Sequence, residues 1–123
     1  MAERIIKPWG WSQEVYRDEL TRVVRIHVEP GGFCSWHRHD RQINTFHVIR
    51  GDLRLFYEDG TCQVGDKNPC RILSIQSRTE HQFENESSSP VEALEIYTST
   101  DGSPPDESDI VRFNEGGIRS PSS

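Results

Sequence analysis

Short apolar runs with the two-residue period of β-strands recur along this chain, and turn-forming residues separate them at regular intervals. Residues 20–28 show the pattern clearly, with Val24, Ile26 and Val28 on one face. Between positions 17 and 98 no segment has a convincing amphipathic helix period. This combination predicts an all-β fold, a sandwich or a small barrel, in a single domain. Further strands are expected at residues 44–49, 53–57, 71–75, 80–84 and 91–98.

The stretch 31–51 concentrates polar groups of the kind that bind metals. His37 and His39 form an H-x-H pair, and on a strand their side chains point to the same face, about 6–7 Å apart along it. Two imidazoles at this spacing can converge on one metal ion. His81 lies well downstream and supplies a third nitrogen. The pattern therefore predicts a metal site built from three histidines, with Asn44 as the candidate fourth ligand.

The types of ligand restrict the identity of the metal but leave its fourth ligand undecided. Three neutral imidazoles suit Fe(II), Mn(II), Ni(II), Co(II) or Zn(II). Asn44 offers only a neutral carbonyl oxygen, so a bound ion would keep its double charge and attract an anionic ligand. Gln42 and Asp40, in the loop after His39, are alternative ligands. The competing interpretation is that no metal binds and the histidines only form hydrogen bonds inside the fold.

Strand alternation also assigns the neighbours of these groups. Two apolar residues share a face with Asn44, and one shares a face with His81, so they are expected to line or fill a pocket. His27 and His47 fall on the opposite parity from their apolar neighbours, which favours a position outside the site. The candidate pocket residues are Phe46, Val48, Phe83 and Gln42.

Composition excludes several classes of protein. A length of 123 residues fits one domain with a single core. The net charge of −6 argues against a nucleic-acid-binding protein, which normally has a basic face. No segment has the apolar length of a signal peptide or a membrane span, so we expect a cytoplasmic protein. Cys34, Cys62 and Cys70 are expected to be reduced thiols, although the sequence leaves one disulfide open.

The two ends of the chain differ in what they can bury. Near the start, Trp9 and Trp11 follow a Pro-containing break and are expected to cap an open end of the core. The last ten residues, 114–123, contain little that could be buried, so we expect a flexible tail after a domain of residues 1–113.

The H-x-H stretch resembles the first motif of the cupin superfamily, in which a glutamate usually follows the histidine pair and a glycine closes the segment. The matching positions are Gly31, His37, His39, Asn44 and Gly51, with asparagine in place of the glutamate. The second cupin motif is matched by its histidine, His81, and its asparagine, Asn85. Gln76 and Arg78 stand where that motif has proline and glycine.

A closer resemblance covers nearly the whole chain. The segments KPWGW, VVRIHVEPGG, HQFENESSSPVEALEIYT and ESDIVRFNE look like the cupin domain of type II mannose-6-phosphate isomerases, which often accompanies mannose-1-phosphate guanylyltransferases. The resemblance implies a double-stranded β-helix, or jelly-roll barrel, with a divalent metal inside, and a homodimer. This sequence departs from that family at Asn44, where a metal carboxylate is usual, and at Gln82, where an arginine is usual.

Two functional hypotheses follow. The first is a metal-dependent enzyme that isomerises or epimerises a sugar or sugar phosphate, or an Fe(II)-dependent dioxygenase. It lacks an obvious general base, because strand alternation turns Glu80 and Glu84 away from the face of His81. The second is a non-enzymatic cupin that binds a carbohydrate or small anion. The arginines that could bind a phosphate are scattered along the sequence: Arg25, Arg41, Arg54, Arg71 and Arg78.

Overall fold

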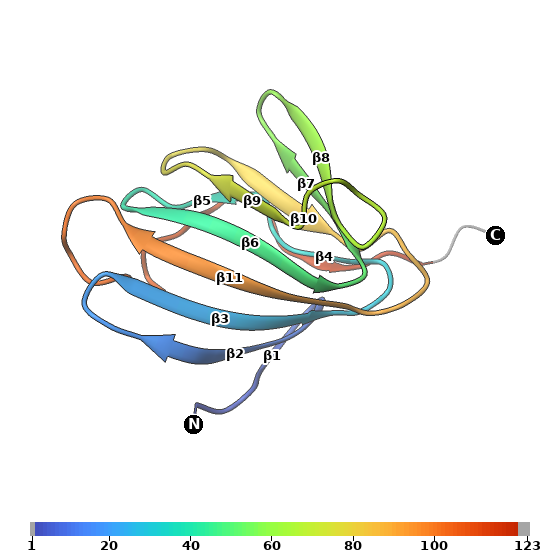
Figure 1. The fold of residues 1–123 in the computed structure, drawn as a ribbon, viewed down its shortest axis with the longest axis horizontal. Helices are drawn as coiled ribbons and strands as arrows, with labels where there is room; N and C mark the ends of the chain where they lie inside the picture. The colour runs from blue at the N-terminus through green and yellow to red at the C-terminus, as the bar shows by residue number, and fades with distance from the viewer. Residues whose placement is uncertain (1, 121–123) are drawn as a thin grey trace.

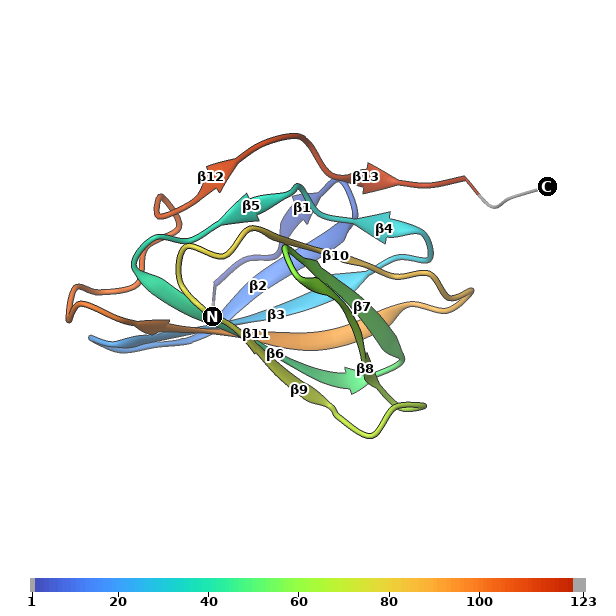
Figure 2. The ribbon, with the colours of Figure 1, turned by 90° about the horizontal axis from the view of Figure 1, so that it is seen from above.

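The chain folds into two antiparallel β-sheets that lie face to face (Figures 1 and 2). The computed structural model describes residues 2–120, and the predicted all-β architecture is confirmed. Within this range no helix is long and apolar enough to cross a membrane. The strands are β1 (Ile5–Lys7), β2 (Gly10–Arg17), β3 (Thr21–Val28), β4 (Gly32–Phe33), β5 (His37–Arg38), β6 (Gln42–Arg50), β7 (Asp52–Tyr57), β8 (Gly60–Gly65), β9 (Ile72–Ile75), β10 (His81–Glu84), β11 (Val91–Ser99), β12 (Val111–Arg112) and β13 (Gly117–Ile118).

The first sheet has the order β1-β2-β3-β11-β6-β9, with the long strand β11 near its centre. Alternate residues of β3, β6 and β11 face inward, and the pairing aligns these residues in rows across the sheet. One row is apolar, since Ala93 lies opposite both Ile26 and Val48. Four residues further along β11, Tyr97 lies opposite Asn44 on β6. The inner face of this sheet therefore changes from apolar to polar along its strands.

The apolar half of the interior holds the two sheets together. Val28, Leu53, Leu55, Val64 and Val91 have no exposed surface. Burying a side chain of this size contributes about 1.5–3 kcal/mol to stability. Because this half supplies the core, the other half of the interior is free to carry polar groups.

The second sheet is made of short strands in the order β12-β5-β10-β4-β13, and the hairpin β7–β8 joins it through β10. His81 on β10 lies directly opposite His37 on β5. On the other side of β5, Arg112 of β12 is also the partner of His37. Residues paired in this way project to the same face of a sheet. The pairing thus places two histidines and one arginine side by side, from segments far apart in the sequence.

Several elements were not expected from the sequence. Gly10–Arg17 forms β2. Gly60–Gly65 forms β8, although its hairpin with β7 agrees with the turn that Asp59 and Gly60 predict. Residues 114–120, expected to belong to a tail, contribute β13, which pairs with β4; positions 121–123 lie outside the described residues. Trp9 is buried and packs edge-on against Phe83, but Trp11 stacks on His27 on the outer face instead of capping the core.

The cysteines form no disulfide. Cys34, Cys62 and Cys70 are all free, in buried, half-buried and exposed positions respectively. Burial raises the pKa of the Cys34 thiol, so this side chain behaves as a neutral, packed group.

Candidate metal centre

Three histidines meet in the polar half of the interior. His37 and His81 are cross-strand partners, and His39 follows two positions after His37 on the same face. The ring centroids of His37 and His81 are 4.4 Å apart, those of His37 and His39 are 5.0 Å apart, and those of His39 and His81 are 5.6 Å apart. One ring nitrogen from each residue lies within 4.8 Å of the others. The cluster expected from the H-x-H spacing and the distant third histidine is therefore assembled by the fold.

Each imidazole is oriented by a hydrogen bond from Nδ1 to a backbone carbonyl. A carbonyl oxygen can only accept, so the Nδ1 atoms carry the proton and each Nε2 keeps a free lone pair. Such a bond also fixes the ring orientation, as it does around metal-binding histidines in general. The three bonds are His37 Nδ1 to Ser35 O (2.7 Å), His39 Nδ1 to Asp109 O (2.8 Å) and His81 Nδ1 to Thr79 O (2.8 Å).

The environment keeps two of these rings neutral. Burial, together with the neighbouring histidines, lowers the pKa of His37 to about 2. Burial likewise lowers the pKa of His81 to about 4. Metal binding requires a deprotonated nitrogen. At neutral pH His37 and His81 therefore offer lone pairs without any need to lose a proton.

The interior also contains unpaired Lewis bases. Among the described residues, four buried side-chain atoms have no hydrogen-bond partner. An unsatisfied buried polar atom costs about 1–3 kcal/mol, and a cation could satisfy lone-pair donors of this type. Imidazole nitrogens with an amide oxygen form a donor set that suits the divalent ions Mn, Fe, Co, Ni and Zn. The residues present therefore fit a metal. The four atoms are His39 Nε2, His81 Nε2, Asn44 Oδ1 and Gln42 Oε1.

The amide of Asn44 is oriented by a carboxylate. Its Nδ2 donates to Glu95 Oε2 at 3.0 Å, and the side chain is fully buried. The amide oxygen is therefore on the side away from Glu95 and lacks a protein partner. This geometry leaves Oδ1 free to act as a neutral ligand, as the sequence suggested.

The other candidates occupy different positions. Gln42 lines the cavity and donates through Nε2 to Asp109 Oδ2 at 2.9 Å. Asp40 is half-exposed and accepts from Arg38, so it is engaged away from the cluster. Phe83 lines the cavity. Phe46 and Val48 are fully buried and belong to the core, and neither lines the cavity.

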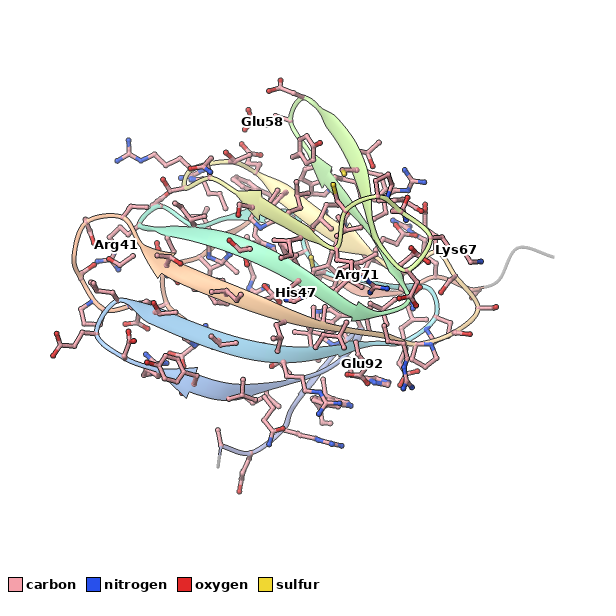
Figure 3. The ribbon with its side chains drawn as sticks, in the orientation of Figure 1. Arg41, His47, Glu58, Lys67, Arg71 and Glu92 are labelled. Atoms are coloured by element: carbon pink, nitrogen blue, oxygen red, sulfur yellow. The ribbon has the colours of Figure 1, made fainter. Side chains whose placement is uncertain are left out.

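A cavity of about 460 Å³ opens onto this cluster, which is a volume suited to a small organic ligand. His37 and His39 line it, together with Tyr97 and Glu95. His27 and His47 lie outside it; Figure 3 shows His47 on the outer face of β6. The cavity thus gives a ligand access to His37 and His39, while His81 does not line it.

The most informative residue that the sequence analysis missed is Glu95. It is only 5% exposed, lines the cavity, and accepts hydrogen bonds at Oε2 from Asn44 and from Tyr97 Oη at 2.5 Å. Its Oε1 has no protein partner among residues 2–120. The signal was present in the sequence, because Glu95 has the same parity as Val91 and Ala93 on β11. A carboxylate on a buried strand face is a candidate functional group.

Comparison with known proteins agrees with this geometry. A family model described as "Cupin domain" matches residues 24–97, more than half of the chain. This chain belongs to the cupin family. A putative mannose-1-phosphate guanylyltransferase of Vibrio cholerae is 34% identical over 109 residues, which are 89% of this chain and 22% of the relative. A mannose-1-phosphate guanylyltransferase of Klebsiella pneumoniae is 30% identical over 111 residues, 90% of this chain and 22% of the relative. The cupin chain thus spans about a fifth of the length of these relatives.

Two solved structures share the cupin architecture. Oxalate decarboxylase from Bacillus subtilis superimposes with a TM-score of 0.74 at 17% identity, covering 91% of this chain and 30% of the other. KdgF from Halomonas sp. superimposes with a TM-score of 0.71 at 14% identity, covering 86% of this chain and 89% of the other. At such identities the comparison establishes the fold.

The departures from the second cupin motif are accommodated locally. Gln82, on the opposite face of β10 from His81, donates through Nε2 to the carbonyl of Cys34 at 2.9 Å. Arg78 has a φ of 66°, the left-handed conformation for which glycine is favoured. Its backbone N–H donates to the carbonyl of His39 at 2.6 Å. The turn that precedes His81 therefore keeps a glycine-like geometry although the residue is an arginine.

Proposed function

We propose that this cupin is a metal-dependent enzyme that isomerises or epimerises a sugar or a sugar phosphate. The names of the relatives point to a sugar phosphate, mannose 1-phosphate, as the substrate of those longer proteins. The single observation that carries the proposal is the buried carboxylate of Glu95 beside the three-histidine cluster. It supplies the proton-transfer group that the sequence analysis did not find.

The histidine cluster and Glu95 have separate roles in the proposed reaction. A divalent cation, held by His37, His39 and His81 with the Asn44 oxygen, would supply Lewis acidity towards a substrate carbonyl. Glu95 removes the proton from the carbon next to that carbonyl. When the proton is delivered to the former carbonyl carbon, and the proton of the adjacent hydroxyl moves to the former carbonyl oxygen, the result is isomerisation. Epimerisation requires a proton donor, such as water, on the opposite face of the same carbon.

The surroundings of Glu95 suit this role. Tyr97 and Asn44 both donate to Oε2, so the carboxylate is held in one orientation. Burial and the neighbouring Glu95 raise the pKa of Tyr97 well above its usual value, so the phenol keeps its proton and stays a donor. With Oε2 occupied, Oε1 is the oxygen left to exchange a proton with a ligand in the cavity.

The proposal is tested by solvent exchange. Protein reconstituted with each candidate metal is incubated in D₂O with a panel of aldose and ketose phosphates and the corresponding free sugars, and proton NMR follows deuterium uptake beside the carbonyl. Glu95→Gln should lower the exchange rate by roughly 10²- to 10⁴-fold while metal content is unchanged. Glu92→Gln, on the outer face of the same strand, is the matched control and should exchange like the wild type.

The non-enzymatic alternative gives a different result. A wild-type protein with stoichiometric metal that exchanges no proton in any member of the panel, yet is stabilised thermally by one of them, is a binding protein. That outcome would reject the enzymatic proposal.

A further inference from the structure

The cavity is lined by positive charges that the sequence analysis did not single out. Lys7, on the first strand β1, and Arg112, on β12 near the other end of the chain, both line it. Arg112 is the cross-strand partner of His37, so its side chain leaves the sheet on the face of the cluster. Its Nη1 donates to Oγ of Ser35 at 3.0 Å, and Ser35 lies two positions before His37 in the sequence. The two ends of the chain thus bring cations to one cavity.

These two cations lack a carboxylate partner. Within residues 2–120, most arginines of this protein form ion pairs, as Arg38 does with Asp40 and Arg54 with Glu86. Neither Lys7 nor Arg112 forms one with a described residue. Lys7 is half-buried and Arg112 is exposed, and two unpaired like charges that share one cavity favour the binding of an anion between them.

The two charges are also close enough to influence each other. Burial, followed by the charge of Arg112, lowers the pKa of Lys7. This agrees with the cavity, which both side chains line, and with the strand pairing that puts Arg112 beside His37.

The acidic residues around the cavity are engaged elsewhere or lie apart from the pair. Glu107 bonds to Arg17 at 3.1 Å and lies 3.8 Å from Arg22. Asp106 accepts from the backbone N–H of Ser108 at 2.9 Å within its own turn. Glu115 is exposed and makes no hydrogen bond to a described residue. Glu95 also lines the cavity, but its Oε2 accepts from Asn44 and Tyr97, and it forms no ion pair with Lys7 or Arg112. Among the described residues the two cations are therefore left without an ion-pair partner.

We infer that Lys7 and Arg112 form an anion subsite in the metal cavity, which binds a phosphate or carboxylate group of the ligand. The inference rests on the proposed function for the rest of the ligand, whose reacting carbon would lie at the histidine cluster and Glu95. A guanidinium can hold two oxygens of a phosphate or carboxylate at once, and a lysine adds a point charge. A cavity of about 460 Å³ has room for a monosaccharide that carries such a group.

The test measures binding without catalysis. Calorimetric titrations on protein stripped of metal with EDTA compare glucose 6-phosphate, glucuronate, glucose and inorganic phosphate in a phosphate-free buffer. Lys7→Gln and Arg112→Gln should each weaken binding of the anionic ligand by roughly 10- to 100-fold, the effect of losing a charge-assisted hydrogen bond. Arg50→Gln removes one exposed charge at the far end of β6 and should leave affinity within about twofold.

Each outcome bears on the subsite. Preference for glucose 6-phosphate over glucuronate identifies a phosphate, and the reverse preference identifies a carboxylate; weakening by both variants supports the subsite in either case. Anion binding that is absent, that survives both substitutions, or that requires added metal would overturn it. Arg112→Lys keeps the positive charge but loses the planar guanidinium that can hold two oxygens at once. An affinity between those of the wild type and of Arg112→Gln would therefore show that binding is weakened by lost recognition and not by misfolding.

The two proposals fail independently. Anion binding that depends on Lys7 and Arg112, without deuterium exchange in any sugar, would leave the subsite intact and reject the enzymatic function. Deuterium exchange in sugar phosphates that is unaffected by the two substitutions would leave the enzymatic function intact and reject the subsite.

Discussion

The amide of Asn44 donates to the carboxylate of Glu95 at 3.0 Å, and this bond joins the candidate metal centre to the candidate proton-transfer group. An amide is the side chain that can donate to a carboxylate on one side while it presents an oxygen on the other. The carboxylate usual at position 44 in the cupin motif has no such donor. Asparagine at position 44 is therefore matched to the acid on β11.

This relationship predicts a large penalty for Asn44→Asp. The substitution removes the donor and places two buried carboxylates within hydrogen-bond distance, so one of them must stay protonated. We expect the metal-free variant to lose about 2–4 kcal/mol of stability at pH 7 in urea unfolding. Excess Mn(II) or Zn(II) should restore more stability to the variant than to the wild type, because the ion then meets an additional negative ligand.

Asn114→Asp is the control for that experiment. Asn114 is exposed and uses its Oδ1 to accept from the Trp36 backbone at 2.7 Å, a role that aspartate can keep. Its stability should change by less than about 0.5 kcal/mol. If metal-free Asn44→Asp unfolds at the wild-type urea concentration, the two carboxylates do not interact as the structure implies.

The histidine cluster predicts one divalent ion per chain. Protein purified without a histidine tag should hold, or take up, close to one equivalent of Mn, Fe, Co, Ni or Zn by elemental analysis. The His37→Ala/His39→Ala double variant should hold none. At a free metal concentration 100 times the dissociation constant, the ion should stabilise the wild type by about 2.7 kcal/mol.

Two outward-facing histidines give the matched control for metal content. His27 bonds to Glu92 and stacks on Trp11, and His47 lies on the outer face of β6 (Figure 3). The His27→Ala/His47→Ala variant should retain the metal. A wild-type protein that stays empty after incubation with every candidate ion would contradict the site.

The sequence predicted the parts of this fold that depend on local alternation. The inward face of β3, with Val24, Ile26 and Val28 buried, follows directly from the two-residue period. The H-x-H pair could likewise be assigned to one face. The same rule places Glu95 of β11 on the buried face, but nothing local in the sequence indicates that this strand lies beside the histidines, because Glu95 is far from His81 in the chain.

The sequence did not place the elements that depend on long-range pairing. β12 is two residues long, and only its pairing with β5 brings Arg112 to the histidine cluster. Lys7 reaches the cavity from the opposite end of the chain. No local pattern encodes which strand such short segments join, so these charges were overlooked. The arginines that were considered, such as Arg41 and Arg71, lie at separate positions on the outside (Figure 3).

The hydrogen bond between Tyr97 and Glu95 predicts a measurable coupling. Tyr97→Phe keeps the edge-on packing against His39 but removes the donor to a buried carboxylate. Loss of a charge-assisted bond of this kind should lower the free energy of unfolding by about 1.5–3 kcal/mol. In a double-mutant cycle with Glu95→Gln, a coupling energy of at least about 1 kcal/mol is expected.

Tyr16 offers the matched comparison. Its hydroxyl donates to Asp18 at 2.6 Å, the same chemistry as in Tyr97, but both residues are exposed. Tyr16→Phe should therefore change stability by less than about 0.5 kcal/mol. Equal effects of the two substitutions would show that burial does not strengthen the Tyr97 bond.

The left-handed turn at Arg78 predicts which of two variants at this position is the more stable. Arg78 has a φ of 66°, a conformation that costs a residue with a Cβ about 1–2 kcal/mol relative to glycine. Arg78→Ala keeps this strain, whereas Arg78→Gly removes it and also gains entropy in the unfolded chain. The glycine variant should be more stable than the alanine variant by roughly 0.5–1 kcal/mol, measured by urea unfolding of the metal-free protein. An alanine variant as stable as the glycine variant would show that the turn before His81 relaxes out of the left-handed region.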